Sequence, residues 1–377
     1  VARAGGVYLP LDPSHPAARL AFLLEDAAPC RLLVGSSVAA LGRELDPAAW
    51  PLADVAADAT QVGEEREDVL PGQWPGLDSG FCRLYTSGST GHPKATVMNH
   101  GAWLGRLQAL GARLELSSAD RCTSTVSPGF DASPFEILAA LGVGARLEIV
   151  PSEIAGSAPS FGDWLAERRS SVTILPAAIA AGLIGQPQRT DLALRAVTSG
   201  GDRLLAGPPR GSGYRVFNCY GPTEATLAVT IEEVGPEAQL PPIGRPIDGV
   251  RLRVAGARGE RVPRGVPGEL WIGGDGLAWG YLGRPGLTAE RFVPDAEGAG
   301  PGARTYRSGD LVRFRPDGAL DFLGRLDQQV KLRGQRLELG EVEARLRALP
   351  GVAAVACVVA ASAAGEPQLV AHLVPEP

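Results

Sequence analysis

The sequence is poor in lysine: among its 36 basic residues, only Lys94 and Lys331 are lysines. Alanine, glycine and proline are abundant, which is typical of a GC-rich coding sequence, so arginine is the default surface cation. A chemical need for a compact ammonium group would explain why the two lysines are retained, because arginine and lysine are not interchangeable. Chance is the alternative explanation for each.

Cysteine and histidine are too few and too scattered to indicate a disulfide framework or a zinc site. The five cysteines stand far apart, at positions 30, 82, 122, 219 and 357, and the four histidines form no ligand set. None of the cysteines belongs to a closely spaced pair of the kind that binds metal. Reduced thiols in a cytoplasmic protein are the simplest interpretation.

The chain also lacks the features of a membrane protein and of a general nucleic-acid binder. No apolar run reaches membrane-spanning length, and no basic-then-apolar leader stands at the start. The net charge of −6 disfavours a general nucleic-acid binder. We therefore expect neither a membrane nor a nucleic acid as a partner. Residues 1–6 look like the interior of a fold, and we expect the start to be truncated.

The apolar segments predict an α/β core. A chain of 377 residues that is 45% hydrophobic can form a large core and more than one domain. Short β-branched runs alternate with helical patterns, which is typical of a layered α/β fold. Strands are expected at residues 31–34, 146–150, 172–175, 194–198 and 215–218, and helices at 16–25, 134–141 and 161–168. The stretch from 53 to 78, which contains a run of charges, is expected to be a surface loop.

Two further patterns follow this core. From residue 251 the pattern is β, with strands expected at 251–255, 269–273, 311–315 and 319–323. After residue 325, a strand-like segment at 330–338 precedes a helical face and two more strand-like runs, 352–360 and 368–374. The expected class is α/β, with a layered large core of mixed β-sheets and helices over residues 1–326, including a β-rich subdomain from about 251. A small α+β C-terminal subdomain, incomplete at its end, is expected over residues 327–377.

Residues 84–96 read LYTSGSTGHPKAT and form the most informative segment. Hydroxyl residues and glycines run without a break from Thr86 to Gly91 and precede Lys94. Glycines let backbone N–H groups approach a ligand, hydroxyls donate hydrogen bonds and the lysine adds charge, so the segment predicts a polyanion-binding loop. A flexible linker is the alternative. The spacing does not match a Walker A motif, because Gly88, Gly91 and Lys94 stand three apart.

Seven segments along the chain form a specific ordered pattern. They are residues 3–13 (RAGGVYLPLDP), 84–96, 130–133 (FDAS), 218–224 (NCYGPTE), 268–282 (GELWIGGDGLAWGYL), 306–311 (YRSGDL) and 324–338 (GRLDQQVKLRGQRLE). In this order they resemble the core motifs of adenylation domains from nonribosomal peptide synthetases, which belong to the adenylate-forming superfamily with acyl-CoA synthetases and luciferases. The resemblance spans nearly the whole chain. One motif alone would be weak, whereas seven in order are specific.

The resemblance implies an ATP-dependent ligase of secondary metabolite and antibiotic biosynthesis in bacteria. Such an enzyme joins an amino-acid carboxylate to AMP, releases pyrophosphate and passes the acyl group to the phosphopantetheine thiol of a separate carrier domain. Two anions must approach one another, so their charges need neutralising. ATP and Mg²⁺ are the implied cofactors. The implied partners are the amino acid, a peptidyl carrier protein domain, neighbouring synthetase domains and a small MbtH-like activator.

The family's ATP-binding and catalytic residues carry over to matching positions. Glu224 is implied to bind Mg²⁺, a hard cation that prefers carboxylate oxygen, with Thr223 near the α-phosphate. Asp327 matches the family hinge, and Lys331 matches a hinge-proximal lysine associated with transfer to the thiol, although a surface charge is the alternative. The implied phosphate-binding residues are Thr86, Ser87, Gly88, Ser89, Thr90, Gly91 and Lys94. The implied nucleoside-binding residues are Gly200, Gly201, Asn218 and Tyr220 at adenine, and Asp310 and Arg325 at the ribose.

Asp131 allows two interpretations. Residues 133–136 (SPFE) read as a capping box with proline at the first helical position, so Ser133 would cap the helix and Asp131 would stand too early to cap it. A carboxylate beside Phe130 and Ala132 would be costly without a cation. The family role, pairing with the α-ammonium of the substrate, fits this demand. Aryl-acid-activating relatives usually lack this aspartate, so its presence favours an α-amino acid.

The resemblance also implies a side-chain pocket without charged residues. A charged substrate side chain would be left unpaired there, so we expect a hydrophobic amino acid, aromatic ahead of branched aliphatic. The implied lining residues are Ala132, Phe135, Ala178, Val197, Ser199, Cys219, Leu227 and Ala228.

The sequence departs from the family pattern at several positions. The family's C-terminal catalytic lysine would lie beyond residue 377, so we expect this chain to adenylate slowly. Phe322 stands where a tyrosine is common, and Ala95 and Thr96 replace the usual Gly-Val. Two alternatives stay open: an acyl- or aryl-CoA ligase of the same superfamily, and a non-catalytic remnant that only binds nucleotide or carrier protein.

Overall fold

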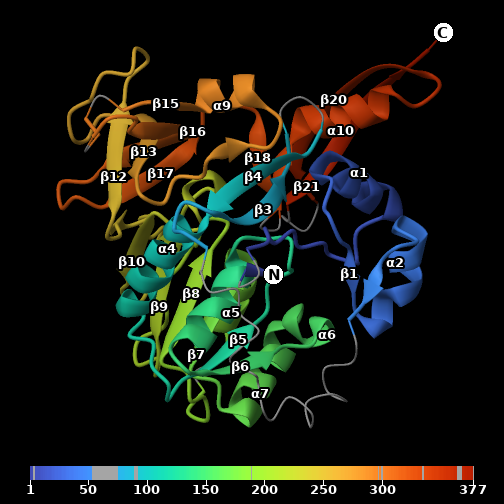
Figure 1. Ribbon diagram of the computed structural model, residues 1–377. Helices are drawn as coiled ribbons and strands as arrows, with labels where there is room; N and C mark the ends of the chain where they lie inside the picture. The colour runs from blue at the N-terminus through green and yellow to red at the C-terminus, as the bar shows by residue number, and fades with distance from the viewer. Residues whose placement is uncertain are drawn as a thin grey trace.

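The structure is a computed structural model that describes residues 1–2, 5–52, 75–88, 92–187, 189–295, 297–298, 300–332, 335–362 and 367–376. The described residues up to 326 form the larger part of the structure. A seven-stranded sheet lies at the centre of this part (Figure 1). Five neighbouring strands are parallel: β6 (Arg146–Ile149), β5 (Arg121–Ser124), β7 (Val172–Pro176), β8 (Ala196–Gly200) and β9 (Arg215–Tyr220). Two antiparallel strands, β10 (Thr230–Val234) and β11 (Arg245–Pro246), extend the sheet beyond β9.

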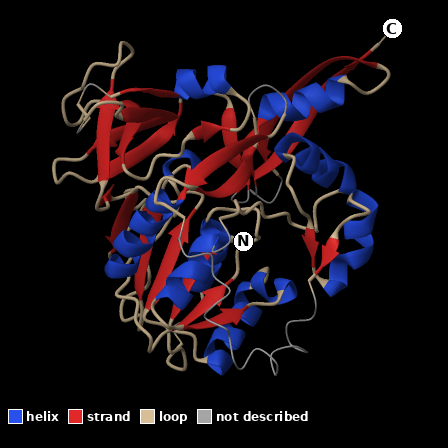
Figure 2. Ribbon diagram, in the orientation of Figure 1, coloured by secondary structure: helices blue, strands red, loops and turns tan. Residues whose placement is uncertain are grey.

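Helices cover both faces of this sheet (Figure 2). One core contains side chains of α4 (His100–Arg113) and α5 (Ala132–Gly142), and a second core contains those of α7 (Ala158–Arg168) and α8 (Ala177–Ile184). Successive residues of one strand point to opposite faces. Accordingly, Ala196 of β8 belongs to the first core and Val197 to the second.

Two smaller sheets lie beside the central one. Strands β3 (Gly80–Thr86) and β4 (Lys94–Asn99) form an antiparallel pair, with β14 (Gly280–Tyr281) on the outer side of β4. The second sheet is formed by β12 (Val250–Ala255), β13 (Gly268–Gly274), β16 (Arg304–Phe314), β15 (Phe292–Pro294) and β17 (Leu320–Arg325). The remaining elements of the larger part are α1 (Ala17–Ala27), β1 (Leu33–Val34), α2 (Ala39–Leu45), β2 (Trp50–Pro51), α6 (Ser152–Ala155) and α9 (Pro285–Arg291), with short 3₁₀ turns at Ser36–Val38 and Thr223–Ala225.

The described residues after 326 form two antiparallel strand pairs and one helix. Strand β18 (Gln329–Leu332) pairs with β19 (Gln335–Glu338), and α10 (Leu339–Arg347) then leads to the pair β20 (Val352–Ala361) and β21 (Pro367–Pro375). In Figure 1 these elements lie near α1 and the β3–β4 pair. Hydrogen bonds from Ser87 to Arg336 and from Gly88 to Glu341 join the two regions.

The predicted α/β class with mixed sheets is confirmed. Instead of the single strand expected at 330–338, the structure has two antiparallel strands, β18 and β19, with Leu332 opposite Gln335. Helix α4 and strand β5 were not predicted. Most of the expected surface loop, residues 53–74, lies outside the described residues. Within the part of the chain that the structure describes, no helix has both the length and the apolarity needed to cross a membrane.

Candidate functional site

The β3–β4 hairpin carries the described part of the hydroxyl- and glycine-rich loop. Ser87 Oγ donates to the carbonyl oxygen of Arg336 at 2.8 Å, and the Gly88 N–H donates to Glu341 Oε2 at 3.3 Å. A Cβ at Gly88 would lie 1.9 Å from the carbonyl oxygen of His92, so only glycine fits there. Three further predicted phosphate-binding residues, Ser89, Thr90 and Gly91, lie outside the described residues.

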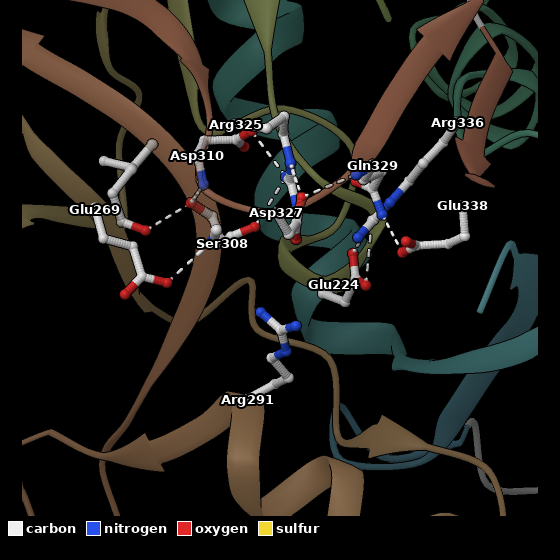
Figure 3. Close-up of polar contacts among 12 residues, drawn as sticks. Glu224, Glu269, Arg291, Ser308, Asp310, Arg325, Asp327, Gln329, Arg336 and Glu338 are labelled. Carbon is white, nitrogen blue, oxygen red and sulfur yellow. Dashed lines mark hydrogen bonds and ion pairs between the residues drawn. The ribbon is translucent and has the colours of Figure 1, made fainter. Parts of the chain in front are cut away.

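A buried charge cluster lies at the end of this hairpin. Lys94, 6% exposed, donates to Tyr281 Oη at 3.3 Å and lies 3.8 Å from Glu224 Oε1, while Tyr281 donates to the same carboxylate oxygen at 2.8 Å. Arg336 Nη1 donates to Glu224 Oε1 at 3.2 Å and to Oε2 at 2.9 Å, and Figure 3 shows these two side chains facing one another. The cluster therefore joins β4, β14, β19 and the turn after β9.

Glu224 is ionised in this setting although no part of it is exposed to solvent. Burial alone would raise the pKa of its carboxyl, but Arg336, Lys94 and the Tyr281 hydrogen bond together hold that pKa at about 2. Burial lowers the pKa of Lys94, and the charge of Glu224 opposes this effect. The sequence pattern did not single out Arg336, whose only signal is its place in the motif at 324–338.

A second polar network lies at the same carboxyl end of β9, around its last residue, Tyr220. Tyr220 Oη donates to Asp310 Oδ2, and Arg325 Nη1 donates to Asp310 Oδ1 at 2.8 Å. Arg325 also makes a two-point contact with Asp327, at 2.9 and 2.5 Å, as Figure 3 shows. Asn218, although 3% exposed, is already paired through Nδ2 with the carbonyl oxygen of Pro242 at 2.8 Å. The predicted adenine, ribose and hinge residues Tyr220, Asp310, Arg325 and Asp327 thus lie in one hydrogen-bonded chain.

Asp131 stands at the N-cap position of α5 but makes no capping hydrogen bond. Thr223 Oγ1 donates to its Oδ2 at 2.6 Å. Burial raises the pKa of Asp131 to about 6, against the effect of this hydrogen bond. The predicted capping box is wrong: α5 begins at Ala132, so Ser133 lies inside the helix, and Glu136 accepts hydrogen bonds from Thr125 and Val126.

Asp131 opens onto a largely apolar cavity of about 250 Å³. The predicted residues Ala132, Phe135, Cys219, Leu227 and Ala228 line it, together with the adenine-site residues Gly200, Gly201 and Tyr220. Further lining residues come from the segment after β5, from β7 and from β8, among them Thr125, Val126, Ser127, Phe130, Ile174 and Thr198.

Three of the expected pocket residues do not line this cavity. Val197 packs in the second core, and its neighbour Thr198 faces the cavity instead, because alternate residues of β8 point to opposite faces of the sheet. Ser199 is fully buried, and Ala178 is exposed on α8. Thr198 Oγ1 is buried without a hydrogen-bond partner among the described residues.

A second cavity of about 410 Å³ adjoins the first. Gly201, Cys219, Tyr220 and Gly221 line both, so the two spaces meet where β8 and β9 end. Ligands of open α/β sheets bind at such carboxyl ends. Asn218, Phe322 and Lys331 also line the second cavity, and Lys331 Nζ lies 5.9 Å from the centre of the Tyr220 ring.

Gly200 and Gly221 let the chain pass closely at this junction. A Cβ at Gly200 would lie 3.2 Å from the carbonyl oxygen of Cys219, and one at Gly221 would lie 2.2 Å from that of Leu227. Gly201 has a φ of +81°, a conformation that glycine adopts at little cost. Gly201 and Gly221 line both cavities and add no side chain at their junction.

Comparison with known proteins agrees with this geometry. The model of the family described as "AMP-binding enzyme" matches residues 1–282. The chain is 40% identical over 387 aligned residues to chondramide synthase cmdD of Chondromyces crocatus and 40% identical over 359 to phosphinothricin tripeptide synthetase PhsC of Streptomyces viridochromogenes. It spans 98% and 93% of its own length in these alignments, but only 9% and 32% of the two relatives.

Solved structures are similar over the whole chain. One is a four-domain nonribosomal peptide synthetase bound to AMP and glycine, with a TM-score of 0.73 and 30% identity; the match covers 100% of this chain and 28% of that one. Another is an artificially fused adenylation–PCP di-domain from Klebsiella oxytoca, with a TM-score of 0.79 and 26% identity; this match covers 98% of this chain and 73% of that one.

Proposed function

Because this chain belongs to the AMP-binding enzyme family and is an adenylation domain of the nonribosomal peptide synthetase type, we propose that it activates an α-amino acid as an aminoacyl adenylate. The observation that carries the proposal is the position of Asp131. This aspartate supplies the carboxylate of a largely apolar cavity, where it accepts a hydrogen bond from Thr223, and that cavity adjoins the second one. Such a carboxylate suits a substrate that has one cationic group and an apolar side chain.

The two ends of the substrate would meet different walls of the first cavity. The α-ammonium would pair with Asp131, which is the charge that the buried carboxylate otherwise lacks. The side chain would lie among Phe135, Leu227 and Ala228, with Thr198 as the polar group of that wall. We propose a hydrophobic amino acid, aromatic ahead of branched aliphatic. Apart from Asp131, which would pair with the α-ammonium, the described lining residues carry no charge that could pair with a charged substrate side chain.

ATP would occupy the second cavity and the surface between β4 and Glu224. The adenine would stack on Tyr220, beside Asn218 and the backbone at Gly201, and the ribose hydroxyls would donate to Asp310, which Arg325 and Tyr220 hold in place. The phosphates would contact the loop from Thr86 to Gly91, together with Lys94. Thr86 Oγ1 is buried without a hydrogen-bond partner among the described residues, which fits a ligand-binding role.

Mg²⁺ would need Glu224, and in this arrangement the residues present do not fit the ion. Both carboxylate oxygens of Glu224 already accept from Arg336, and one also accepts from Tyr281. Mg²⁺ demands oxygen ligands in near-ideal octahedral geometry, which a guanidinium in contact with the same oxygens prevents. Glu224 can serve as a metal ligand only when Arg336 has withdrawn.

We further propose that residues 327–377 form a small unit that moves about Asp327 between two steps, amino-acid activation and transfer to a carrier-protein thiol. Arg336 and Glu341 belong to this unit and contact Glu224 and Gly88 of the proposed phosphate site. The arrangement therefore suits the state after pyrophosphate has left. Lys331, beside Tyr220, would act in the transfer step. A carrier domain, neighbouring synthetase domains and a small MbtH-like activator are the proposed partners.

Amino-acid-dependent exchange of radiolabelled pyrophosphate into ATP by the full-length protein tests the proposal. We expect exchange with one or a few hydrophobic amino acids and none with aspartate, glutamate, lysine or arginine. A preference for a charged amino acid would overturn the substrate proposal. Exchange that depends on a fatty or aryl acid would favour the CoA-ligase alternative, and no exchange with any acid would favour a non-catalytic binding protein.

A further inference from the structure

Glu136 is a buried acid that none of the proposed contacts to ATP or substrate uses. It lies on α5 directly after Phe135 and is 2% exposed. The Thr125 N–H lies 3.1 Å from both of its carboxylate oxygens, and the Val126 N–H donates to Oε2 at 3.1 Å. The hydroxyls of Thr125, at 2.9 Å, and of Ser124, at 3.3 Å, complete the shell. These bonds tie α5 to the segment that follows β5.

The segment that Glu136 holds is a wall of the substrate cavity. Thr125, Val126 and Ser127 all line that cavity. Thr125 Oγ1 also lies 2.8 Å from the carbonyl oxygen of Ile174, another lining residue, whereas Ser127 is held separately by its hydrogen bond to Asp12. Glu136 is therefore the side chain that fixes the backbone of Thr125 and Val126.

Helix α5 supplies other lining residues of the same cavity. Ala132 and Phe135 lie on its first turns, and Asp131 precedes them. One carboxylate thus connects the helix that carries Asp131 to the segment that carries Thr125 and Val126. We propose that Glu136 is a positioning residue that sets the width of the amino-acid cavity and thereby the selectivity for the substrate side chain. This inference rests on the proposed function and names a specificity determinant of the same site.

A carboxylate suits this task better than a neutral side chain. Its two oxygens accept from two backbone N–H groups and the Ser124 hydroxyl, and the Thr125 hydroxyl is within reach of both Glu136 and the Ile174 carbonyl oxygen. A glutamine offers one acceptor oxygen and would direct its NH₂ group at a donor. Burial raises the pKa of Glu136 to about 7 in spite of these bonds, so the charged form has a free-energy cost at this position. If Glu136 only filled space in this core, an apolar residue of similar size would do so at a lower free-energy cost.

The test compares three variants of the full-length protein by pyrophosphate exchange. They are Glu136→Gln, Glu136→Asp and, as the matched control, Glu148→Gln. Glu148 is also buried and lies on β6 of the same sheet, but it pairs with Arg146 and Arg121 and does not line the cavity.

We expect Glu136→Gln to lower kcat/KM for the preferred amino acid by about 10- to 100-fold, because displacement of a positioned wall by about 1 Å can cost about 100-fold. The KM for ATP should stay within about twofold. Wild-type discrimination between side chains that differ by one methylene is expected at about 10- to 200-fold and should fall below about tenfold in this variant. Glu136→Asp keeps the carboxylate, so its kcat/KM and its discrimination should lie between those of the wild type and those of Glu136→Gln.

Each alternative result overturns the inference. If Glu136→Gln keeps the wild-type discrimination, or if Glu148→Gln loses it equally, Glu136 has no special role in the cavity. Equal increases of KM for ATP and for the amino acid would indicate general damage to the fold, which also contradicts the inference. If the wild-type protein shows no amino-acid-dependent exchange, the proposed function fails first and this inference fails with it.

Discussion

Replacement of Arg336 with methionine should release the β18–β19 strand pair from the larger part of the protein. Arg336 contacts both oxygens of Glu224, whose pKa lies at about 2 instead of its usual 4.5. This difference corresponds to about 3 kcal/mol in favour of the ionised carboxylate, at about 1.4 kcal/mol for each tenfold change, and Arg336 makes the largest of the three favourable contributions, ahead of Lys94 and Tyr281. Glu224 is fully buried, so water screens little of this energy. Removal of one partner of a buried pair has a comparable cost, about 3–5 kcal/mol.

Hydrogen exchange of the backbone amides in β18 and β19 measures this effect. A loss of about 3 kcal/mol should accelerate exchange of these amides by about 100-fold, while amides of β8 and β9 keep their protection. Arg245→Met is the control, because Arg245 is 45% exposed and its pairs with Glu232 and Asp317 lie at the surface. Such pairs contribute about 0–1 kcal/mol. If Arg336→Met changes the exchange of β18 and β19 no more than the control does, the proposed docking contact is refuted.

Three further predictions concern the larger part of the protein. Asp131→Asn should raise the KM for the amino acid by about 100-fold or more, since loss of one partner of a buried charge pair costs about 2–5 kcal/mol, with the KM for ATP unchanged in pyrophosphate exchange. Because the pKa of Asp131 is raised to about 6, its carboxylate is lost as the pH falls through that value, so kcat/KM for the amino acid should decline below pH 6 in the wild type but not in Asp131→Asn. Gly221→Ala should lower the free energy of unfolding in urea by about 1–3 kcal/mol, because its Cβ would lie 2.2 Å from the carbonyl oxygen of Leu227; stability equal to the wild type would contradict this close approach.

The sequence pattern was sufficient for the fold class and for most strands, since each depends on local periodicity. It was not sufficient where a shift of one residue along a strand or helix decides which side chain faces the cavity or caps the helix. The resemblance implied Val197 as a pocket residue, whereas the alternation along β8 directs its neighbour Thr198 to the cavity. The start of α5 was misplaced because Glu136, expected to complete a capping box, accepts instead from the backbone N–H groups of Thr125 and Val126.

The remaining features that the sequence did not predict are contacts between segments far apart in the chain. Arg336 and Glu224 stand 112 residues apart in the chain, and nothing in the local pattern around either one indicates the other. The same holds for the contact of Gly88 with Glu341, which crosses the boundary proposed at Asp327. The motifs predicted which residues gather at the carboxyl ends of β8 and β9, whereas the cationic side chain that contacts Glu224 required the folded chain.

The central claim is that Asp131 recognises the α-ammonium group of an amino acid that the protein then joins to AMP. The most direct test compares the amino acid that drives the fastest pyrophosphate exchange with the same acid lacking its α-amino group, for example phenylalanine with 3-phenylpropanoate. We predict a kcat/KM at least about 100-fold higher for the amino acid, a difference that Asp131→Asn abolishes, since loss of a buried charge pair costs about 2–5 kcal/mol. Equal exchange with both acids would contradict the account.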